Sequence, residues 1–429
     1  MLLDFTVKNF RSFKNETVLS AEAGERLRKY NNENTKIING KRILKDLFIF
    51  GPNGTGKSNL LMGLKAMKKM VLNDPPKITT KLPYQPFAFG NETSNDPVEL
   101  KISFTFKKKI YIYSFGFIED RIIHESLKIC LKGKEETYFE RYENKFRVIP
   151  DELRLAGKQT KKNTLFLYSA QKLNDEDSTN VVEWFNNDLI FFEDFVHVNR
   201  KIKKLIGDER TKNALVKFLK FADINIENLF TQEHKIPEPI KKIIEKSELA
   251  NDDEFKEEIT TEIVTEHKCY DDKGRVISKK IWNIDNESEG TKKLFLIGLV
   301  LVYAKRFGDN KVLIFDEFEN SLHRELSCAL VKILNSTQNN SQVISTTHEL
   351  KILDSGLRTD QIYFVEKDFR GISSIKSIFD FKDSKGHGRV DITYVKRYIA
   401  GLYGAYPHIN EDEMREALNS VCEDGDADA

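Results

Sequence analysis

GPNGTGKS, residues 51–58, is the stretch that decides the fold of this chain. The apolar run Asp46–Phe50 before it predicts a short buried strand, and the apolar spacing after it predicts a helix to about Leu72. The pattern G-x-x-x-x-G-K-[ST] between a strand and a helix is typical of a phosphate-binding loop. The alternative is a plain glycine-rich turn that precedes a helix.

Each residue type in this loop has a physical task. The glycines let the backbone turn tightly and approach a ligand, and the loop amides then point at an anion at the positive end of the helix. A lysine brings a charge to the β- and γ-phosphates, and a serine hydroxyl can bind Mg²⁺. The predicted phosphate-binding residues are Gly51, Asn53, Gly54, Thr55, Gly56, Lys57 and Ser58.

Two later strands are predicted to end in chemically useful side chains. The run at 312–315 ends in Asp316 and Glu317. Asp316 is expected to hold the Mg²⁺ shell together with Ser58, and Glu317 to orient and deprotonate the attacking water. The strand at 342–347 ends at His348, which we expect beside the acidic strand end, within reach of the γ-phosphate or the water. The alternatives are a solvated acidic turn and a polar strand cap.

Composition bounds the class of protein. The 429 residues carry 68 Lys+Arg and 67 Asp+Glu, so no global attraction to nucleic acid or membrane is expected, although local basic patches remain possible contacts. The N-terminus does not resemble a signal peptide, and the longest apolar run is too short for a bilayer. The four scattered cysteines argue against a disulfide framework or a zinc site and fit a cytoplasmic protein: Cys130, Cys269, Cys328 and Cys422.

The chain in order predicts an α/β fold with a mixed sheet. Residues 24–41 are polar and asparagine-rich, which favours a loop, and alternation from Val98 onward predicts an antiparallel β-meander. Helical spacing predicts a helical insertion at 151–258, including a helix at 240–249, and a β-hairpin follows it. The expected domains are a discontinuous head (1–150 and 259–405), this insertion, and a C-terminal helix with an acidic tail (406–429).

The stretch at 286–293 leads into an apolar helix. Ser288 or Glu289 is expected to cap this helix, with Gly290 and Thr291 in its first turn. The helix N-terminus is a second ready anion site. Taken alone, a plain capped helix explains the stretch equally well.

The order of these motifs resembles the ABC-type ATPase head, a P-loop NTPase shared by RecF, the SMC proteins and the OLD-family ATPases. The chain is most similar to compact ATPases of bacterial anti-phage systems, including the RloA, abortive-infection L and PARIS AriA ATPases. The segments that carry this likeness are VKNFRSFKNETVLS (7–20), PFAF (86–89), DEFENSLH (316–323) and YIAGLYGAYPHI (398–409).

The resemblance implies ATP and Mg²⁺ as cofactors and a homodimer or higher oligomer of heads. The ABC signature is matched by Ser288, Glu289, Gly290 and Thr291, although the double glycine of the family is Glu289-Gly290 here. In that family the signature of one head touches the γ-phosphate bound to the opposing head. Ser321 and His323 fall in the D-loop region, where the family often has an aspartate at the position of His323. Arg11 matches an arginine near the nucleotide, and Gln85 is the candidate metal-binding glutamine of the Q-loop.

OLD nucleases also carry a C-terminal Toprim domain, and only 63 residues follow Glu366, the one candidate for its glutamate. We therefore expect an ATPase that is not itself a nuclease. The first hypothesis is the sensor or scaffold ATPase of an anti-phage system, which controls a separately encoded effector of the Toprim-nuclease type and responds to a phage trigger. The alternatives are a RecF-like ATPase that clamps DNA, and a nucleotide-dependent scaffold with little hydrolysis. DNA or RNA contact stays open, and no membrane contact is expected.

Overall fold

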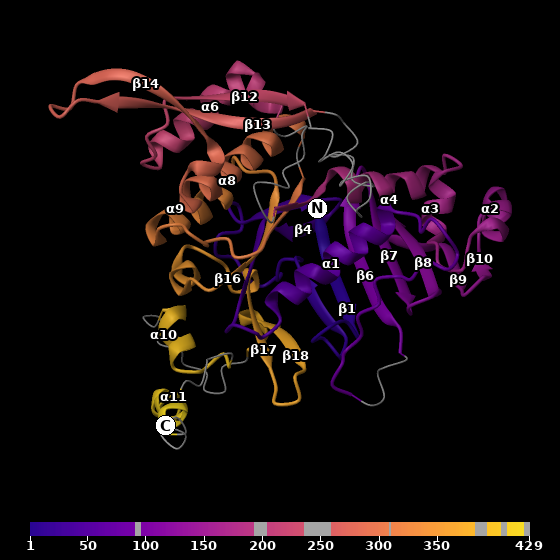
Figure 1. Ribbon diagram of the computed structural model, residues 1–429. Coiled ribbons are helices and arrows are strands. Elements are labelled where there is room, and N and C mark those ends of the chain that lie inside the picture. The colour runs from indigo at the N-terminus through magenta and orange to yellow at the C-terminus, as the bar shows by residue number, and fades with distance from the viewer. Residues whose placement is uncertain are drawn as a thin grey trace.

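The computed structural model (Figure 1) describes residues 1–90, 96–192, 204–235, 259–308, 310–381, 393–404 and 410–423. Its centre is a six-stranded sheet in the order β11-β15-β16-β5-β17-β18. The first five strands are parallel, and β18 is antiparallel at one edge. The strands are β5 (Asp46–Phe50), β11 (Leu189–Phe192), β15 (Val312–Phe315), β16 (Gln342–Thr347), β17 (Ile362–Lys367) and β18 (Ser373–Ser377).

The central sheet is buried on both faces, as the continuous apolar runs of its strands require. Along β5, Leu47 and Ile49 belong to one core cluster, and the alternating Phe48 and Phe50 belong to another. The first cluster contains helix α1 (Lys57–Leu72), and the second contains helices α8 (Glu289–Phe307) and α9 (Arg324–Leu334). The sheet is therefore the middle layer between α1 on one side and α8 with α9 on the other.

A second, antiparallel sheet of seven strands packs beyond α1, in the order β10-β9-β8-β7-β6-β1-β2. Trp184 of helix α4 stacks on Phe104 of β6, and Phe166 of α3 contacts Phe139 of β9. The predicted β-meander is confirmed. The elements are β1 (Leu2–Lys8), β2 (Thr17–Ser20), β6 (Val98–Phe106), β7 (Lys109–Phe117), β8 (Ile122–Leu131), β9 (Lys134–Tyr142), β10 (Lys145–Val148), α2 (Arg154–Gln159), α3 (Phe166–Gln171) and α4 (Glu176–Asn187).

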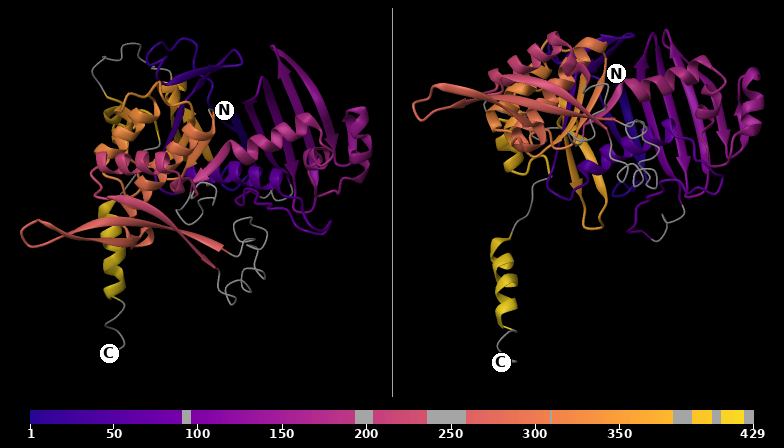
Figure 2. Two further views of the ribbon diagram at one scale, coloured as in Figure 1. Left: turned by 90° about the horizontal axis from the view of Figure 1, so that it is seen from above. Right: turned by 45° about the horizontal axis from the view of Figure 1, so that its top comes forward.

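A third sheet, β12-β13-β14, lies over α8 and α6 (Glu209–Phe221), and Figure 2 shows its hairpin extending past the helices. Its strands are β12 (Asn228–Lys235), β13 (Ile259–Tyr270) and β14 (Val276–Asn283). The predicted hairpin is thus present. Residues 151–258 are mixed rather than wholly helical, because β11 joins the central sheet and β12 joins the third one. The helix expected at 240–249 lies outside the described residues.

The expectation of a loop at 24–41 is wrong for its second half. Residues 35–44 form the hairpin β3 (Thr35–Ile38) and β4 (Lys41–Leu44). Asn39 and Gly40 connect the strands with φ angles of 50° and 80°, the left-handed conformation that a two-residue hairpin turn uses. The Asn-Gly pair is the local signal that identifies this turn.

The chain ends in two helices, α10 (Tyr394–Ile399) and α11 (Glu411–Glu423). Tyr398 and Tyr403 both stack on Phe364 of β17, which attaches α10 to the core. The acidic tail from residue 424 lies outside the described part. The short 3₁₀ helices are η1 (Asp151–Leu153), η3 (Lys204–Gly207), η5 (Ile284–Asn286), η6 (Leu350–Asp354), η7 (Thr359–Gln361) and η8 (Ile378–Asp380).

The α/β class, the mixed sheet and the phosphate-loop position between β5 and α1 are confirmed. The domain boundaries stay a prediction. The strand β11, which belongs to the segment assigned to the insertion, pairs within the central sheet. Among the described residues, none of the helices combines the length and the apolar character that a bilayer span needs.

Candidate nucleotide-binding site

The loop 51–58 lies at the carboxyl end of β5, where parallel α/β sheets bind ligands. Its glycines are sterically required. A Cβ atom on Gly51 would lie 2.5 Å from the carbonyl oxygen of Val365, and one on Gly56 would lie 2.5 Å from the hydroxyl of Ser373. Gly56 also has a φ of 107°, a backbone conformation that residues other than glycine adopt only with strain. Asn53 and Gly54 are exposed at the loop tip.

Lys57 begins α1 and is buried. Its Nζ donates to the carbonyl oxygens of Gly51 and Pro52, at 2.8 and 3.0 Å, so the ammonium lies inside the loop. Burial lowers the pKa of Lys57, and the nearby charges of Asp316 and Glu317 oppose this shift. The lysine and both predicted carboxylates therefore share one electrostatic site.

Asp316 meets the phosphate loop directly. The hydroxyl of Ser58 donates to Asp316 Oδ1 at 3.2 Å, and the hydroxyl of Thr346 on the neighbouring strand donates to the same oxygen. A hydroxyl and a carboxylate are hard oxygen ligands, the kind that Mg²⁺ takes together with phosphate oxygens and water. The donor set fits the predicted magnesium site. No group of three or more His, Cys, Asp or Glu side chains in the described ranges forms a ready metal cage.

Glu317 has a φ of 50°, an unusual conformation for a residue other than glycine. Its N–H donates to the hydroxyl of Thr346 at 2.7 Å, and this bond secures the turn. The side chain of Glu317 is exposed, beside the half-buried Asp316–Ser58 contact. Strained backbone that is fixed by its neighbours is common at functional sites.

His348 follows β16, the strand next to β15, and so reaches the same edge of the sheet as Glu317. Desolvation lowers the pKa of His348, and the charge of Lys57 lowers it further. Both effects favour the neutral form of the imidazole. Its backbone N–H donates to Oε1 of Glu319, which lies in the DEFENSLH segment but was given no role from the sequence.

The loop at residues 9–13 braces the phosphate loop. Arg11 donates from Nε to Gln85 Oε1 at 2.6 Å and from Nη1 to Asn59 Oδ1 at 3.2 Å. Asn59 in turn donates to the hydroxyl of Ser12 at 2.9 Å. Arg11 thus lies at the first turn of α1, and its place near a nucleotide stays a prediction. The amide oxygen of Gln85 faces Arg11. In the described part of the chain, the side chain of Gln85 makes no hydrogen bond to Ser58 or Asp316.

Ser288 caps α8, since its hydroxyl accepts from the N–H of Thr291 at 3.1 Å. Glu289 is exposed and forms an ion pair with Lys292. A Cβ atom on Gly290 would lie 2.6 Å from the carbonyl oxygen of Ser321, so only glycine allows this approach. The signature and D-loop regions are therefore in contact within one chain.

The D-loop region itself turns sharply. Ser321 has a φ of 64°. The side chain of His323 is 82% exposed and pairs with Glu325, Nδ1 to Oε2 at 2.7 Å. His323 is thus on the surface, where another molecule can reach it.

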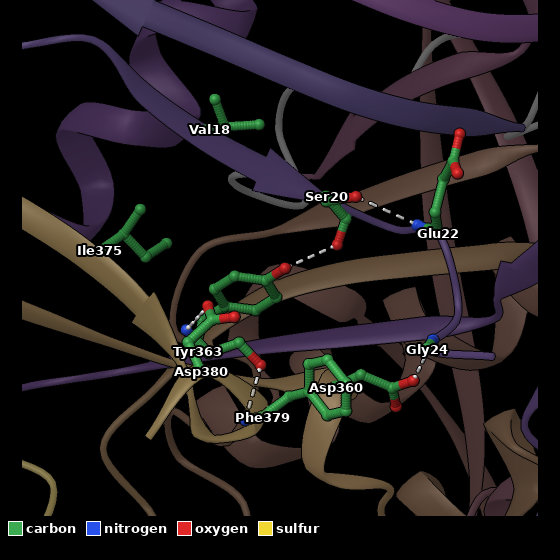
Figure 3. Close-up of a pocket in the computed structure, with 10 residues that line it drawn as sticks. Val18, Ser20, Glu22, Gly24, Asp360, Tyr363, Ile375, Phe379 and Asp380 are labelled. Carbon is green, nitrogen blue, oxygen red and sulfur yellow. Dashed lines mark hydrogen bonds between the residues drawn. The ribbon is translucent and has the colours of Figure 1, made fainter. Parts of the chain in front are cut away.

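A pocket of about 300 Å³ lies apart from this site (Figure 3). Its polar groups bond to one another: the Tyr363 hydroxyl donates to the carbonyl of Ser20, and Asp360 accepts from the N–H of Gly24. The lining residues are Val18, Ser20, Glu22, Gly24, Asp360, Tyr363, Ile375, Ser377, Phe379 and Asp380.

Two residues of the site were missed in the sequence. Thr346 belongs to a predicted strand, but its contacts with Asp316 and Glu317 cross between strands. Glu319 likewise acts on a residue of the next strand. The pattern of residue types along one segment carries no signal for either contact.

Residues 47–354 match the model of a protein family described as "AAA domain, putative AbiEii toxin, Type IV TA system". The match spans well over half of the chain and includes the phosphate loop, the acidic strand end and His348. The chain belongs to this family. No curated protein matches this AAA-domain protein in sequence.

Solved structures similar to this AAA-domain protein include SMC heads. The SMC head domain from Thermotoga maritima is 12% identical with a TM-score of 0.39, and the match covers 88% of this chain and 98% of that one. An Smc head with an extended coiled coil, bound to the C-terminal domain of ScpA derived from Pyrococcus furiosus, is 14% identical with a TM-score of 0.40, covering 88% and 96%. A likeness at this level is too weak to support any inference about activity.

Proposed function

We propose that this AAA-domain protein binds ATP with Mg²⁺ and hydrolyses it to operate a switch. The observation that carries the proposal is the convergence of Lys57, Ser58, Asp316, Glu317 and His348 at one edge of the central sheet. Lys57 would bind phosphate oxygens, and Ser58 with Asp316 would hold Mg²⁺, which would supply positive charge to neutralise that of the phosphates. Glu317 orients the attacking water and takes its proton.

The neutral imidazole of His348 suits a hydrogen bond to the γ-phosphate or to the attacking water, because it adds no charge beside Lys57. Arg11 contributes by fixing the start of α1 through Asn59. No guanine-specific motif marks the sequence, so ATP is the favoured nucleotide.

We further propose that two chains assemble with ATP sandwiched between their heads, in the manner of ABC-type ATPases. Ser288 lies at an exposed helix N-terminus, which attracts anions. Within the described part of the chain, residues 288–291 make no hydrogen bond to the phosphate loop at 51–58. The contact of Gly290 with Ser321 couples the signature to the turn that follows Glu317. Nucleotide at one head can therefore bias the position of the other.

The cellular role in this proposal is that of a cytoplasmic sensor or scaffold in an anti-phage system. Support comes from the family description, which names a toxin of a type IV TA system, and from the resemblance to defence ATPases. A separately encoded effector, such as a Toprim-type nuclease, would be released when a phage trigger changes the assembly. The chain itself is not proposed to be a nuclease.

The test of the ATPase proposal is phosphate release by the purified protein with ATP and Mg²⁺. We expect Lys57→Ala to abolish nucleotide binding, and Glu317→Gln to bind ATP but to hydrolyse it at least 100-fold more slowly. Lys69→Ala is the matched control, because Lys69 is an exposed lysine on the same helix. Hydrolysis by Glu317→Gln at the wild-type rate would overturn the assignment of the general base.

A further inference from the structure

The turn that follows β15 is attached to the end of β16 by a series of bonds. Asp316 accepts from the Thr346 hydroxyl, and Glu317 donates its N–H to that hydroxyl. The N–H of Phe318 donates to the carbonyl oxygen of Thr346 at 3.1 Å. Glu319 adds the last contact of the series and is the only one of these residues that reaches past the end of the strand, to His348.

Oε1 of Glu319 accepts from two consecutive backbone N–H groups, those of His348 and Glu349, the latter at 3.1 Å. These amides follow the last residue of β16, where the sheet ladder no longer supplies partners. A carboxylate that accepts backbone N–H bonds makes charge-assisted hydrogen bonds, which are stronger than neutral ones. The backbone of His348 is therefore fixed by the side chain of Glu319.

The second oxygen of Glu319 is buried, and no hydrogen bond is found for it in the described part of the chain. Leaving a buried polar atom unpaired costs free energy, so packing alone would favour another residue here. The carboxylate charge acts on both Lys57 and His348.

We propose that Glu319 is a positioning residue for His348 in the reaction assigned above. By fixing two successive amides, it fixes the direction in which the His348 side chain leaves the strand. Glu319 touches neither substrate nor metal, and its hydrogen bonds act on the reaction through the backbone of His348. The inference rests on the proposed ATPase function and adds to it a residue that determines the geometry of the histidine.

The chemistry of the contact separates geometry from charge. Gln at position 319 can still accept both N–H bonds through its amide oxygen, although its NH₂ group must then occupy the place of the unpaired Oε2. Asp is one methylene shorter and cannot reach both amides from the same backbone position. Ala leaves the N–H of His348 without its acceptor and leaves the N–H of Glu349 with the hydroxyl of Thr347, to which it also donates at 3.1 Å. The expected order of histidine positioning is Glu, then Gln, then Asp and Ala.

The first experiment is residue-resolved hydrogen exchange on the full chain without nucleotide. In Glu319→Ala we expect the amide of His348 to exchange at least tenfold faster and that of Glu349 to change less, because it also donates to the hydroxyl of Thr347. Protection should be retained in Glu319→Gln. Glu325→Ala, which removes an exposed carboxylate six residues along the chain, is the matched control and should leave both amides unchanged. Unchanged protection in Glu319→Ala would overturn the contact itself.

The second experiment separates kcat from KM for ATP. Glu319→Ala should lower kcat at least tenfold and leave KM within about twofold, and Glu319→Gln should lie between this variant and the wild type. Faster exchange of His348 with an unchanged kcat would overturn the positioning role alone. Absence of ATP hydrolysis in the wild-type protein would overturn the proposed function, and the positioning role with it, whatever the exchange experiment shows.

Discussion

Thr346 provides a sharp test of how the catalytic turn is built. It is fully buried, and its hydroxyl both accepts from the N–H of Glu317 and donates to the carboxylate of Asp316. Thr346→Val keeps the shape of the side chain and removes both bonds. Losing a hydrogen bond to a charged group costs about 1.5–3 kcal/mol, and an N–H left unpaired adds about 1–3 kcal/mol. Because Glu317 is exposed and water can reach its turn, we expect a total destabilisation of about 2–4 kcal/mol.

The effect on catalysis should exceed the effect on stability. Without the Thr346 hydroxyl, the turn keeps the bond from the N–H of Phe318 to the carbonyl of Thr346, but the N–H of Glu317 loses its acceptor. We therefore expect the carboxylate of Glu317 to leave the position that the reaction needs. A displacement of about 1 Å can reduce a rate about 100-fold, which is the fall in kcat that we expect. KM for ATP should change by less than about threefold, because Lys57 and its loop are not altered.

The assay combines phosphate release with urea-induced unfolding. Thr160→Val is the control, since Thr160 is also buried and its hydroxyl donates to a backbone carbonyl, that of Ala156, away from the site. The control should lose some stability and keep its kcat within about twofold. A Thr346→Val protein that is destabilised but hydrolyses ATP at the wild-type rate would refute the role given to this hydroxyl.

Three further predictions follow from single contacts. Glu125→Gln should lower the free energy of unfolding in urea by about 3–5 kcal/mol, because it leaves the charge of the buried Arg141 uncompensated; a loss below 1 kcal/mol would contradict this. Burial raises the pKa of Asp46, so its contribution to the free energy of unfolding is fully present below pH 4 and declines as pH rises. Asp46→Asn should therefore be more stable than the wild type at pH 8, and the difference in free energy of unfolding should close toward pH 4. Parallel curves of stability against pH would exclude this. Gly290→Ala should bind ATP normally but fail to assemble with it in light scattering, because the methyl group displaces the carbonyl of Ser321; normal assembly would disprove the need for that approach.

The part of the site that lies on one continuous segment could be predicted from the sequence. The phosphate loop works through its own backbone and through Lys57, so its pattern contains its chemistry. Asp316 and His348 could also be predicted, because the carboxyl ends of parallel strands meet at one edge of the sheet. The structure brings these residues into one electrostatic site, which is what the predicted strand ends imply.

Contacts between strands could not be predicted in the same way. Thr346 and Glu319 act on residues about 30 positions away, and their roles depend on the register between β15 and β16. The strand β11 was missed because Leu189–Phe192 is four apolar residues directly after a helix, too short for periodicity to separate strand from helix. The β3-β4 hairpin was missed for a different reason: the polar composition outweighed the Asn39-Gly40 turn signal.

Assembly through ATP sandwiched between two heads is tested most directly by light scattering of the Glu317→Gln protein, with and without ATP and Mg²⁺. We expect nucleotide to convert a smaller species into a larger one, and we expect the added change Lys57→Ala to prevent this conversion. A mass that ATP leaves unchanged, in a protein shown to bind ATP, would contradict the nucleotide-sandwiched switch and favour a fixed scaffold.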